Sequence, residues 1–131
     1  MSQENMELVQ RAYEAFDTDL DVLLQLLDPD VEWVSPDDSI EPGRRRGHRG
    51  VRDAFSATAM AWDHPTHTPV EFTDAGDKVL VTVTFRGHGQ SSGMEAERTE
   101  FHVWTVESGA IVGFHWFYER RDALEAVGLM G

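Results

Sequence analysis

Apolar side chains in the first half of the chain recur at helical spacing. In residues 3–16 they fall three and four positions apart, with Gln and Glu on the opposite side, which predicts an amphipathic helix. Asp19 is a suitable N-cap for a second, leucine-rich helix through Leu27, and a third helix is expected over residues 51–62. A short strand at residues 31–34 and a polar loop separate the second helix from the third.

In the second half of the chain, apolar and polar positions alternate with a period of two, which is typical of β-strands. Successive strands joined by short turns pair antiparallel, so the pattern predicts one curved sheet with the helices gathered on one face. This is an α+β fold, in a single domain over residues 1–131, with a short closing helix at residues 122–127. The expected strands cover residues 68–73, 78–88, 94–106 and 110–118.

The last two strands form a hairpin around which we expect the chemistry. A three-residue loop, residues 107–109, fits a type I turn closed by a left-handed Gly109. This loop places His102 opposite Phe114. A two-residue loop is the alternative, and it would move His115 beside His102.

Strict alternation divides this hairpin into two faces. The inner face mixes ionisable groups with aromatic rings, which is typical of a ligand pocket. It holds Glu100, His102, Trp104, Phe114, Trp116 and Tyr118. The outer face is mostly apolar and holds Phe101, Val103, Thr105, Ile111, His115 and Phe117, with Val81, Val83 and Phe85 expected to continue it.

The apolar outer face predicts an assembly. The helices are needed on the inner face, where they close the pocket, so a monomer would expose an apolar patch larger than soluble monomers usually show. A symmetric homodimer that buries one outer face against the other is therefore expected. The alternative is that residues 120–131 fold across this face.

Charge and composition exclude several classes of binding partner and of site. The net charge of -13 argues against nucleic acid and anionic membranes, because both require a basic surface. The sequence has no cysteine, which excludes disulfides and thiolate metal sites. It has no apolar run long enough to cross a membrane and no recognisable signal peptide, so a cytoplasmic protein is expected. An arginine cluster at residues 44–52 is either a solvated basic loop or a rim that attracts anions beside the pocket.

Three stretches together resemble a known family over nearly the whole chain. They are DPDVEW after the leucine-rich helix, RGHRGVRDAF opening the third helix, and RGHGQSSGMEAE followed by FHVWTVESGAIVGFHWF. The order resembles the SnoaL-like, polyketide cyclase-like branch of the nuclear transport factor 2-like superfamily. The resemblance implies a cone-like curved sheet, antiparallel or mixed, with about three helices on one face, and it implies a homodimer.

The superfamily includes isomerases, cyclases, epoxide hydrolases, dehydratases and binding domains, so the resemblance does not settle the chemistry. Its member ketosteroid isomerase has a tyrosine on the first helix that corresponds to Tyr13 here. The oxyanion-binding aspartate of that enzyme falls at His102. Its general-base aspartate falls close to Trp33, where this chain has no carboxylate on the matching side.

His102 is the sequence candidate for an acid or base, because histidine exchanges protons near neutral pH and the neighbouring Glu100 would fix its tautomer. The alternative is a buried histidine that only satisfies a hydrogen bond. Tyr13, His88 or Glu100 is expected to polarise the substrate or a water molecule. The alternative for Tyr13 is a core tyrosine with its hydroxyl at the edge of the core. Residues expected to line the same cavity and bind the ligand are Trp33, Trp62, Thr84, Trp104, Phe114, Trp116 and Tyr118.

No cofactor or metal is expected. A metal site from His88, His102 and Glu100 would lack any helical HxxxH or HExxH spacing, and the chain has neither a serine elbow nor a phosphate-binding glycine loop. Two functions remain open. One is cofactor-free acid–base catalysis of isomerase, cyclase or hydrolase type on a small apolar molecule. The other is a non-catalytic small-ligand-binding or dimerisation domain.

Overall fold

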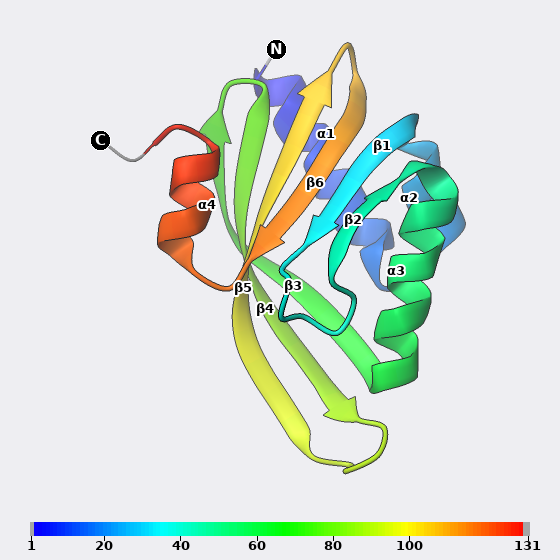
Figure 1. Ribbon diagram of the computed structural model, residues 1–131. Coiled ribbons are helices and arrows are strands. Elements are labelled where there is room, and N and C mark those ends of the chain that lie inside the picture. The colour runs from blue at the N-terminus through cyan, green and yellow to red at the C-terminus, as the bar shows by residue number, and fades with distance from the viewer. Residues whose placement is uncertain (1, 130–131) are drawn as a thin grey trace.

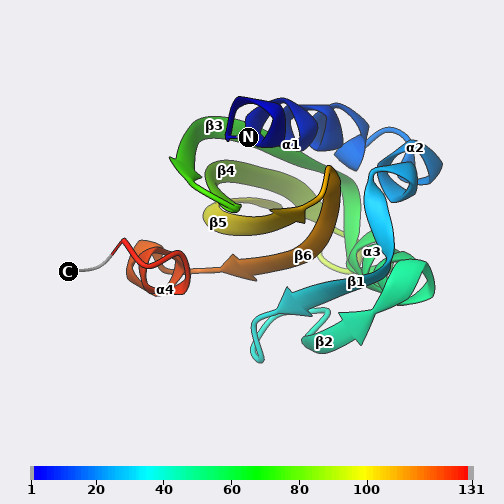
Figure 2. The same ribbon diagram turned by 90° about the horizontal axis from the view of Figure 1, so that it is seen from above.

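Six strands form one curved, mixed sheet in the computed structural model, which describes residues 2–129 (Figures 1 and 2). The strand order is β2-β1-β6-β5-β4-β3, with β1 parallel to β6 and every other neighbouring pair antiparallel. The strands are β1 (Leu27–Ser35), β2 (Gly43–Arg46), β3 (Trp62–Ala75), β4 (Lys78–Gly89), β5 (Glu95–Glu107) and β6 (Ala110–Phe117). The α+β fold with a curved sheet is confirmed.

Helices lie on both faces of the sheet. The helices are α1 (Ser2–Phe16), α2 (Leu20–Gln25), α3 (Gly47–Ala61) and α4 (Arg120–Ala126). Figure 2 shows α1 lying over the concave side of the sheet, with α4 at the far end of β6. The main core joins α1, α2 and α3 to the concave face, while a smaller cluster lies between α4 and the opposite, outer face. Among residues 2–129, no helix has both the length and the apolar character that crossing a membrane requires.

Local sequence signals explain the helix boundaries. The side chain of Asp19 accepts a hydrogen bond from the backbone N–H of Val22 and caps α2, as predicted. Helix α2 ends at Gln25, earlier than predicted, because Leu27 already pairs with Ile111 of β6. The polar loop after β1 contains the additional strand β2, which sequence analysis did not predict.

The β5–β6 hairpin has a different register from the predicted one. Its loop has two residues, Ser108 and Gly109, both left-handed with φ of 51° and 78°, as in a type I′ turn. A bulge at Val112 then adds one more residue to β6. The two shifts together place His102 opposite Trp116, so the predicted pairing of His102 with Phe114 is wrong.

Most side chains of the hairpin stay on their predicted faces. The two one-residue shifts add up to two residues, and a shift by two leaves each side chain on the same face of the sheet. Trp104 and Phe114 are directly opposite each other on the inner face, and Val103 faces His115 on the outer face. Ile111 is the exception. It lies between the turn and the bulge, so it faces the main core, where it is fully buried, and not the outer face as predicted.

Strand β4 is oriented opposite to the prediction. Val81 pairs with His102 and Val83 with Glu100, so these valines and Phe85 share the inner face with them. The expectation that Val81, Val83 and Phe85 continue the outer apolar face is therefore wrong. Helix α4 covers part of the outer face, as in the alternative in which the C-terminal segment folds across it. The outer cluster consists of Leu80, Val103 and Ala123, with Phe101, Phe117, Leu124 and Val127 packed against it.

Candidate functional site

A cavity of about 450 Å³ lies between the inner face of the sheet, the end of α1 and α3. Its walls are largely aromatic, and its ionisable groups come from four different segments of the chain. The aromatic lining consists of Phe16, Trp33, Phe55, Trp62, Phe85, Phe114 and Trp116. The ionisable lining consists of Asp17, Glu41, His64, His67, Arg98, Glu100 and His102.

His102 is held by hydrogen bonds at both of its ring nitrogens. The indole N–H of Trp104 donates to the Tyr13 hydroxyl over 2.9 Å, and the same hydroxyl lies 2.7 Å from His102 Nδ1. His102 Nε2 lies 2.9 Å from Glu100 Oε1. Because an ionised carboxylate can only accept, Nε2–H of a neutral His102 donates to Glu100, which leaves Nδ1 as the acceptor of the hydrogen bond from the Tyr13 hydroxyl.

Electrostatics agree with this assignment. Burial lowers the pKa of His102 and outweighs the opposing effect of Glu100, so the neutral imidazole is favoured. Burial also raises the pKa of Tyr13 well above its ordinary value, which keeps its proton in place. Burial alone would raise the pKa of Glu100, but the hydrogen bond from His102 and nearby positive charge, including that of Arg98, lower it to about 2. Glu100 is therefore a buried, ionised carboxylate.

Arg98 supplies the counter-charge. Its Nε and Nη2 lie 2.9 Å and 2.8 Å from Glu100 Oε2. The guanidinium lies over the ring of Phe85, 4.6 Å from the centroid, and 5.2 Å from that of Trp116. This ion pair forms part of the cavity wall, with the Arg98 side chain 31% exposed and that of Glu100 almost completely buried.

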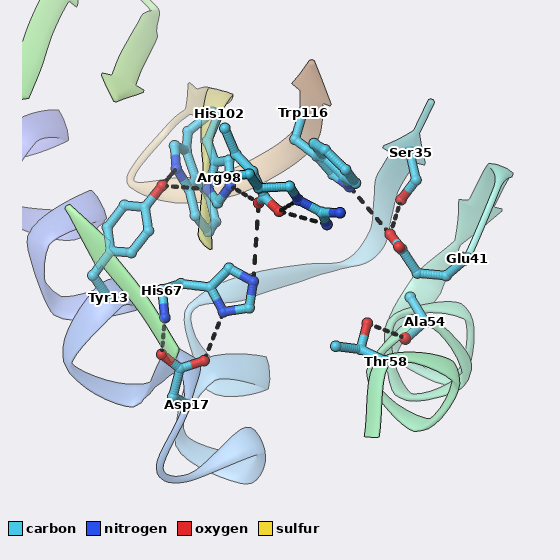
Figure 3. Close-up of polar contacts among 12 residues, drawn as sticks. Tyr13, Asp17, Ser35, Glu41, Ala54, Thr58, His67, Arg98, His102 and Trp116 are labelled. Carbon is cyan, nitrogen blue, oxygen red and sulfur yellow. Dashed lines mark hydrogen bonds and ion pairs between the residues drawn. The ribbon is translucent and has the colours of Figure 1, made fainter. Parts of the chain in front are cut away.

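His67, in β3, is a functional candidate that sequence analysis missed. Asp17, just after α1, accepts from the backbone N–H of His67 and lies 2.8 Å from its Nδ1 (Figure 3). The carboxylate therefore fixes both the ring orientation and the Nδ1–H tautomer. His67 Nε2 faces Glu100 Oε1 at 3.9 Å, beyond hydrogen-bonding distance. In contrast to His102, His67 keeps one ring nitrogen available to a ligand.

Glu41, in the loop between β1 and β2, is a second missed residue. Its Oε2 accepts from the Ser35 hydroxyl at 2.5 Å and from the Trp116 indole at 3.1 Å. The arginine cluster contributes here: Arg45 donates to the backbone carbonyls of Glu41 and Pro42 and fixes this turn. Figure 3 shows Glu41 and Trp116 on the opposite side of the site from Asp17 and His67.

The remaining arginines do not form an anion-attracting rim. Arg44 pairs with Glu32 and Arg52 with Asp21 on the surface, and none of the arginines at positions 44–52 lines the cavity. The cluster is largely solvated, as the first interpretation predicted, but its arginines lie in β2 and the first half of α3 and not in a loop.

Two predicted site residues lie elsewhere. His88 and Thr84 alternate with Val83 and Phe85 along β4, so they lie on the outer face, and the expectation that they line the cavity is wrong. Because His88 is exposed there, the hypothetical metal site from His88, His102 and Glu100 is not assembled. In the part of the chain that the structure describes, no group of three or more His, Cys, Asp or Glu side chains could hold a metal ion.

The other predicted site residues fall into two groups. Tyr13 and Trp104 lie behind His102, away from the cavity, while Tyr118 packs edge-on against Trp116 with ring centroids 4.8 Å apart. The predicted residues that the structure brings together at the cavity are Trp33, Trp62, Glu100, His102, Phe114 and Trp116.

Comparisons with known proteins agree with the fold. A nuclear transport factor 2-like protein of unknown function from Burkholderia pseudomallei K96243 is 29% identical, with 95% of this chain and 97% of that chain covered and a TM-score of 0.81. TerC, co-crystallised with polyporic acid, is 25% identical, with coverages of 95% and 98% and a TM-score of 0.80.

A third structure shows the fold at lower identity. It is a protein with a ketosteroid isomerase-like fold from Catenulispora acidiphila DSM 44928, in complex with trimethylamine. It is 18% identical, with 95% of this chain and 94% of that chain covered and a TM-score of 0.75.

No curated protein matches the sequence. The sequence profile of the SnoaL-like domain family matches residues 9–114, which is most of the chain. The resemblance noted in the sequence is thereby confirmed, and the chain belongs to the SnoaL-like domain family.

Proposed function

We propose that this protein is a cofactor-free enzyme that moves a proton on a small, largely apolar molecule, with His67 as the acid–base group. The observation that carries the proposal is the Asp17–His67 pair at the cavity wall. Asp17 holds Nδ1, and Nε2 faces the cavity beside Glu100. A histidine oriented by a carboxylate with its other nitrogen free is suited to general acid–base catalysis.

The proton balance of such a reaction is simple. Nε2 of His67 accepts a proton from a C–H or O–H bond of the substrate and returns it to another substrate atom, so no oxidant or cofactor is consumed. Ionised Glu100, 3.9 Å away, stabilises the imidazolium while it exists. Arg98 lies at the same wall and can stabilise negative charge that develops on a substrate oxygen. Isomerase and cyclase reactions fit this scheme directly, and a hydrolase reaction fits it when the O–H bond belongs to an attacking water molecule and the proton is returned to the leaving group.

In this proposal His102 has a positioning role. Both of its ring nitrogens bind protein groups, Tyr13 on one side and Glu100 on the other. It is also 1% exposed, so it cannot exchange protons with a ligand without breaking one of these bonds. Tyr13 and His102 therefore hold Glu100 in place beside His67.

Known structures support a small-molecule ligand. TerC was crystallised with polyporic acid, and the ketosteroid isomerase-like protein from Catenulispora acidiphila is in complex with trimethylamine. The cavity of about 450 Å³ is within the usual size range of ligand sites, and its aromatic lining suits an apolar molecule.

A second candidate is a non-catalytic binding domain. The observation in its favour is that every buried side-chain nitrogen and oxygen among the described residues has a hydrogen-bond partner. The Trp104–Tyr13–His102–Glu100 chain is then a structural network that fixes the shape of the cavity.

A screen distinguishes the two candidates. Small apolar carbonyl compounds and phenols would be tested by thermal shift, and each stabilising compound would be incubated with the protein and followed by mass spectrometry. Conversion of a stabilising compound supports the enzyme. Stabilising compounds that are all recovered unchanged, without isotope exchange from heavy water, support the binding domain.

We also propose that the protein forms a homodimer through the outer face of the sheet. Phe101 and Phe117 are only partly buried there, and the ring of His115 stacks on Phe117 with centroids 4.1 Å apart. Helix α4 covers only part of this face, which leaves an aromatic surface for a second copy.

A further inference from the structure

Glu41 is the carboxylate of the cavity that has no counter-charge. Three carboxylates line the cavity, and two of them have partners: Asp17 is bound to His67, and Glu100 to Arg98. The ion pairs found among residues 2–129 do not include Glu41. Its hydrogen bonds come from neutral donors, the hydroxyl of Ser35 and the indole of Trp116.

The position of Glu41 is unusual for such a group. It is 8% exposed, and carboxylates are rarely buried to this extent without a pairing charge. Both hydrogen bonds reach Oε2, and within the described part of the chain none reaches Oε1, an atom that the protein does not fully enclose. Because Glu41 lines the cavity, a ligand can approach the carboxylate from that side.

Both the backbone and the side chain of Glu41 are held in position by hydrogen bonds. Arg45 holds the backbone carbonyl of Glu41 at 2.8 Å, and Ser35 and Trp116 hold the side chain. The rings of Trp116 and Phe55 belong to the same cavity wall. A carboxylate among aromatic rings is a combination that binds organic cations, because the rings attract the cation through their faces while the carboxylate supplies the opposite charge.

We propose that Glu41 is the anchor for a positively charged amine on the ligand. The inference rests on the proposed use of the cavity as a ligand site, and it specifies the substrate class as a small amine with an apolar body. The amine would lie at Glu41, which places the apolar body among the aromatic walls, and the reacting atoms would lie toward His67 on the opposite side (Figure 3).

The charge of the lining favours this class over an anion. The cavity lining contains three carboxylates, those of Asp17, Glu41 and Glu100. Among the described residues, Arg98 is the only arginine or lysine in this lining. The whole chain has a net charge of -13, which attracts cations and repels anions at a distance.

Three probes with the same ring and different charge test the proposal: benzylamine, benzyl alcohol and benzoate, titrated by calorimetry at neutral pH. We expect benzylamine to bind about 10-fold or more tightly than benzyl alcohol, and benzoate to bind most weakly. In the wild-type protein at saturation, benzylamine should also shift the NMR signal of the Trp116 indole N–H, which donates to Glu41, by clearly more than benzyl alcohol does. This local signal does not depend on a variant that folds.

Two variants separate the local charge from the overall charge. Glu41→Gln should lose about 10-fold or more of the benzylamine affinity and keep that for benzyl alcohol. Glu107→Gln removes the same charge at the exposed end of β5 and should change neither. Equal binding of benzylamine and benzyl alcohol, equal losses in the two variants, or no benzylamine binding would each overturn the proposal. Because these are binding measurements, they are independent of whether His67 transfers a proton, which is measured by isotope exchange.

Discussion

His67 Nε2 and Glu100 Oε1 face each other across 3.9 Å at the wall of the cavity. The two groups belong to two separate hydrogen-bonded chains. Asp17 fixes His67 from one side, and His102, with Tyr13 behind it, fixes Glu100 from the other. In the proposed reaction, this contact at the cavity wall is where the acid–base pair meets the ligand.

Asp17→Asn tests the orientation of His67. The asparagine amide can donate to Nδ1, which would move the ring proton to Nε2 and remove the base from the cavity. We expect kcat to fall about 10-fold or more with little change in KM. Nitrogen NMR of the His67 ring should show the change of tautomer in the folded variant, and an unchanged tautomer would contradict this role of Asp17.

Glu100 should make stability depend on acid pH. Its folded pKa of about 2 lies below the ordinary value of 4.5, so its stabilising effect is complete above pH 4.5 and is lost as the pH falls toward 2. Glu100→Gln should cost about 3 kcal/mol at neutral pH, because it breaks a buried charge pair. Urea unfolding across this pH range should show the difference from wild type shrinking with acidity. A difference that is constant between pH 4.5 and pH 2 would argue against the ion pair.

Tyr13→Phe removes the hydroxyl that joins Trp104 to His102. Both buried partners then lose a hydrogen bond, and we expect the free energy of unfolding to fall by about 2 kcal/mol. Chemical denaturation measures this loss. Because Tyr13 does not line the cavity, kcat should fall much less than in a His67 variant, and an equal loss would place Tyr13 in the reaction itself.

Phe117→Arg tests the proposed dimer. A charge placed in the aromatic outer face should dissociate it, and sedimentation equilibrium should then give the monomer mass of 14.8 kDa. Met60→Arg, on the exposed side of α3, is the control and should remain a dimer. A monomer mass for the wild-type protein at micromolar concentration would refute the assembly.

The sequence predicts the elements and the faces of the last hairpin well, because hydrophobic periodicity reports burial directly. It misassigns β4, where valines and threonines alternate and either set could be buried. Val81 and Val83 lie on the inner face because they pair with His102 and Glu100 in the next strand. Alternation cannot supply such a long-range register.

The candidate site was only half predictable for a similar reason. Glu100 and His102 lie on one strand, where spacing alone places them together. The contact between Asp17 and His67 spans 50 positions, and Glu41 reaches Trp116 across 75. His67 also directly precedes the predicted strand at residues 68–73, and extending that alternation toward Trp62 was the signal that could have included it.

Proton exchange between the ligand and solvent tests the central claim most directly. In heavy water, the wild-type protein should transfer deuterium into a bound carbonyl compound at the carbon next to the carbonyl group, as followed by mass spectrometry. His67→Asn, which can still bind Asp17 but lacks Nε2, should slow this exchange about 100-fold or more, while His88→Asn on the outer face should not. Exchange that continues unchanged in the folded His67→Asn variant would contradict the assignment of His67 as the acid–base group.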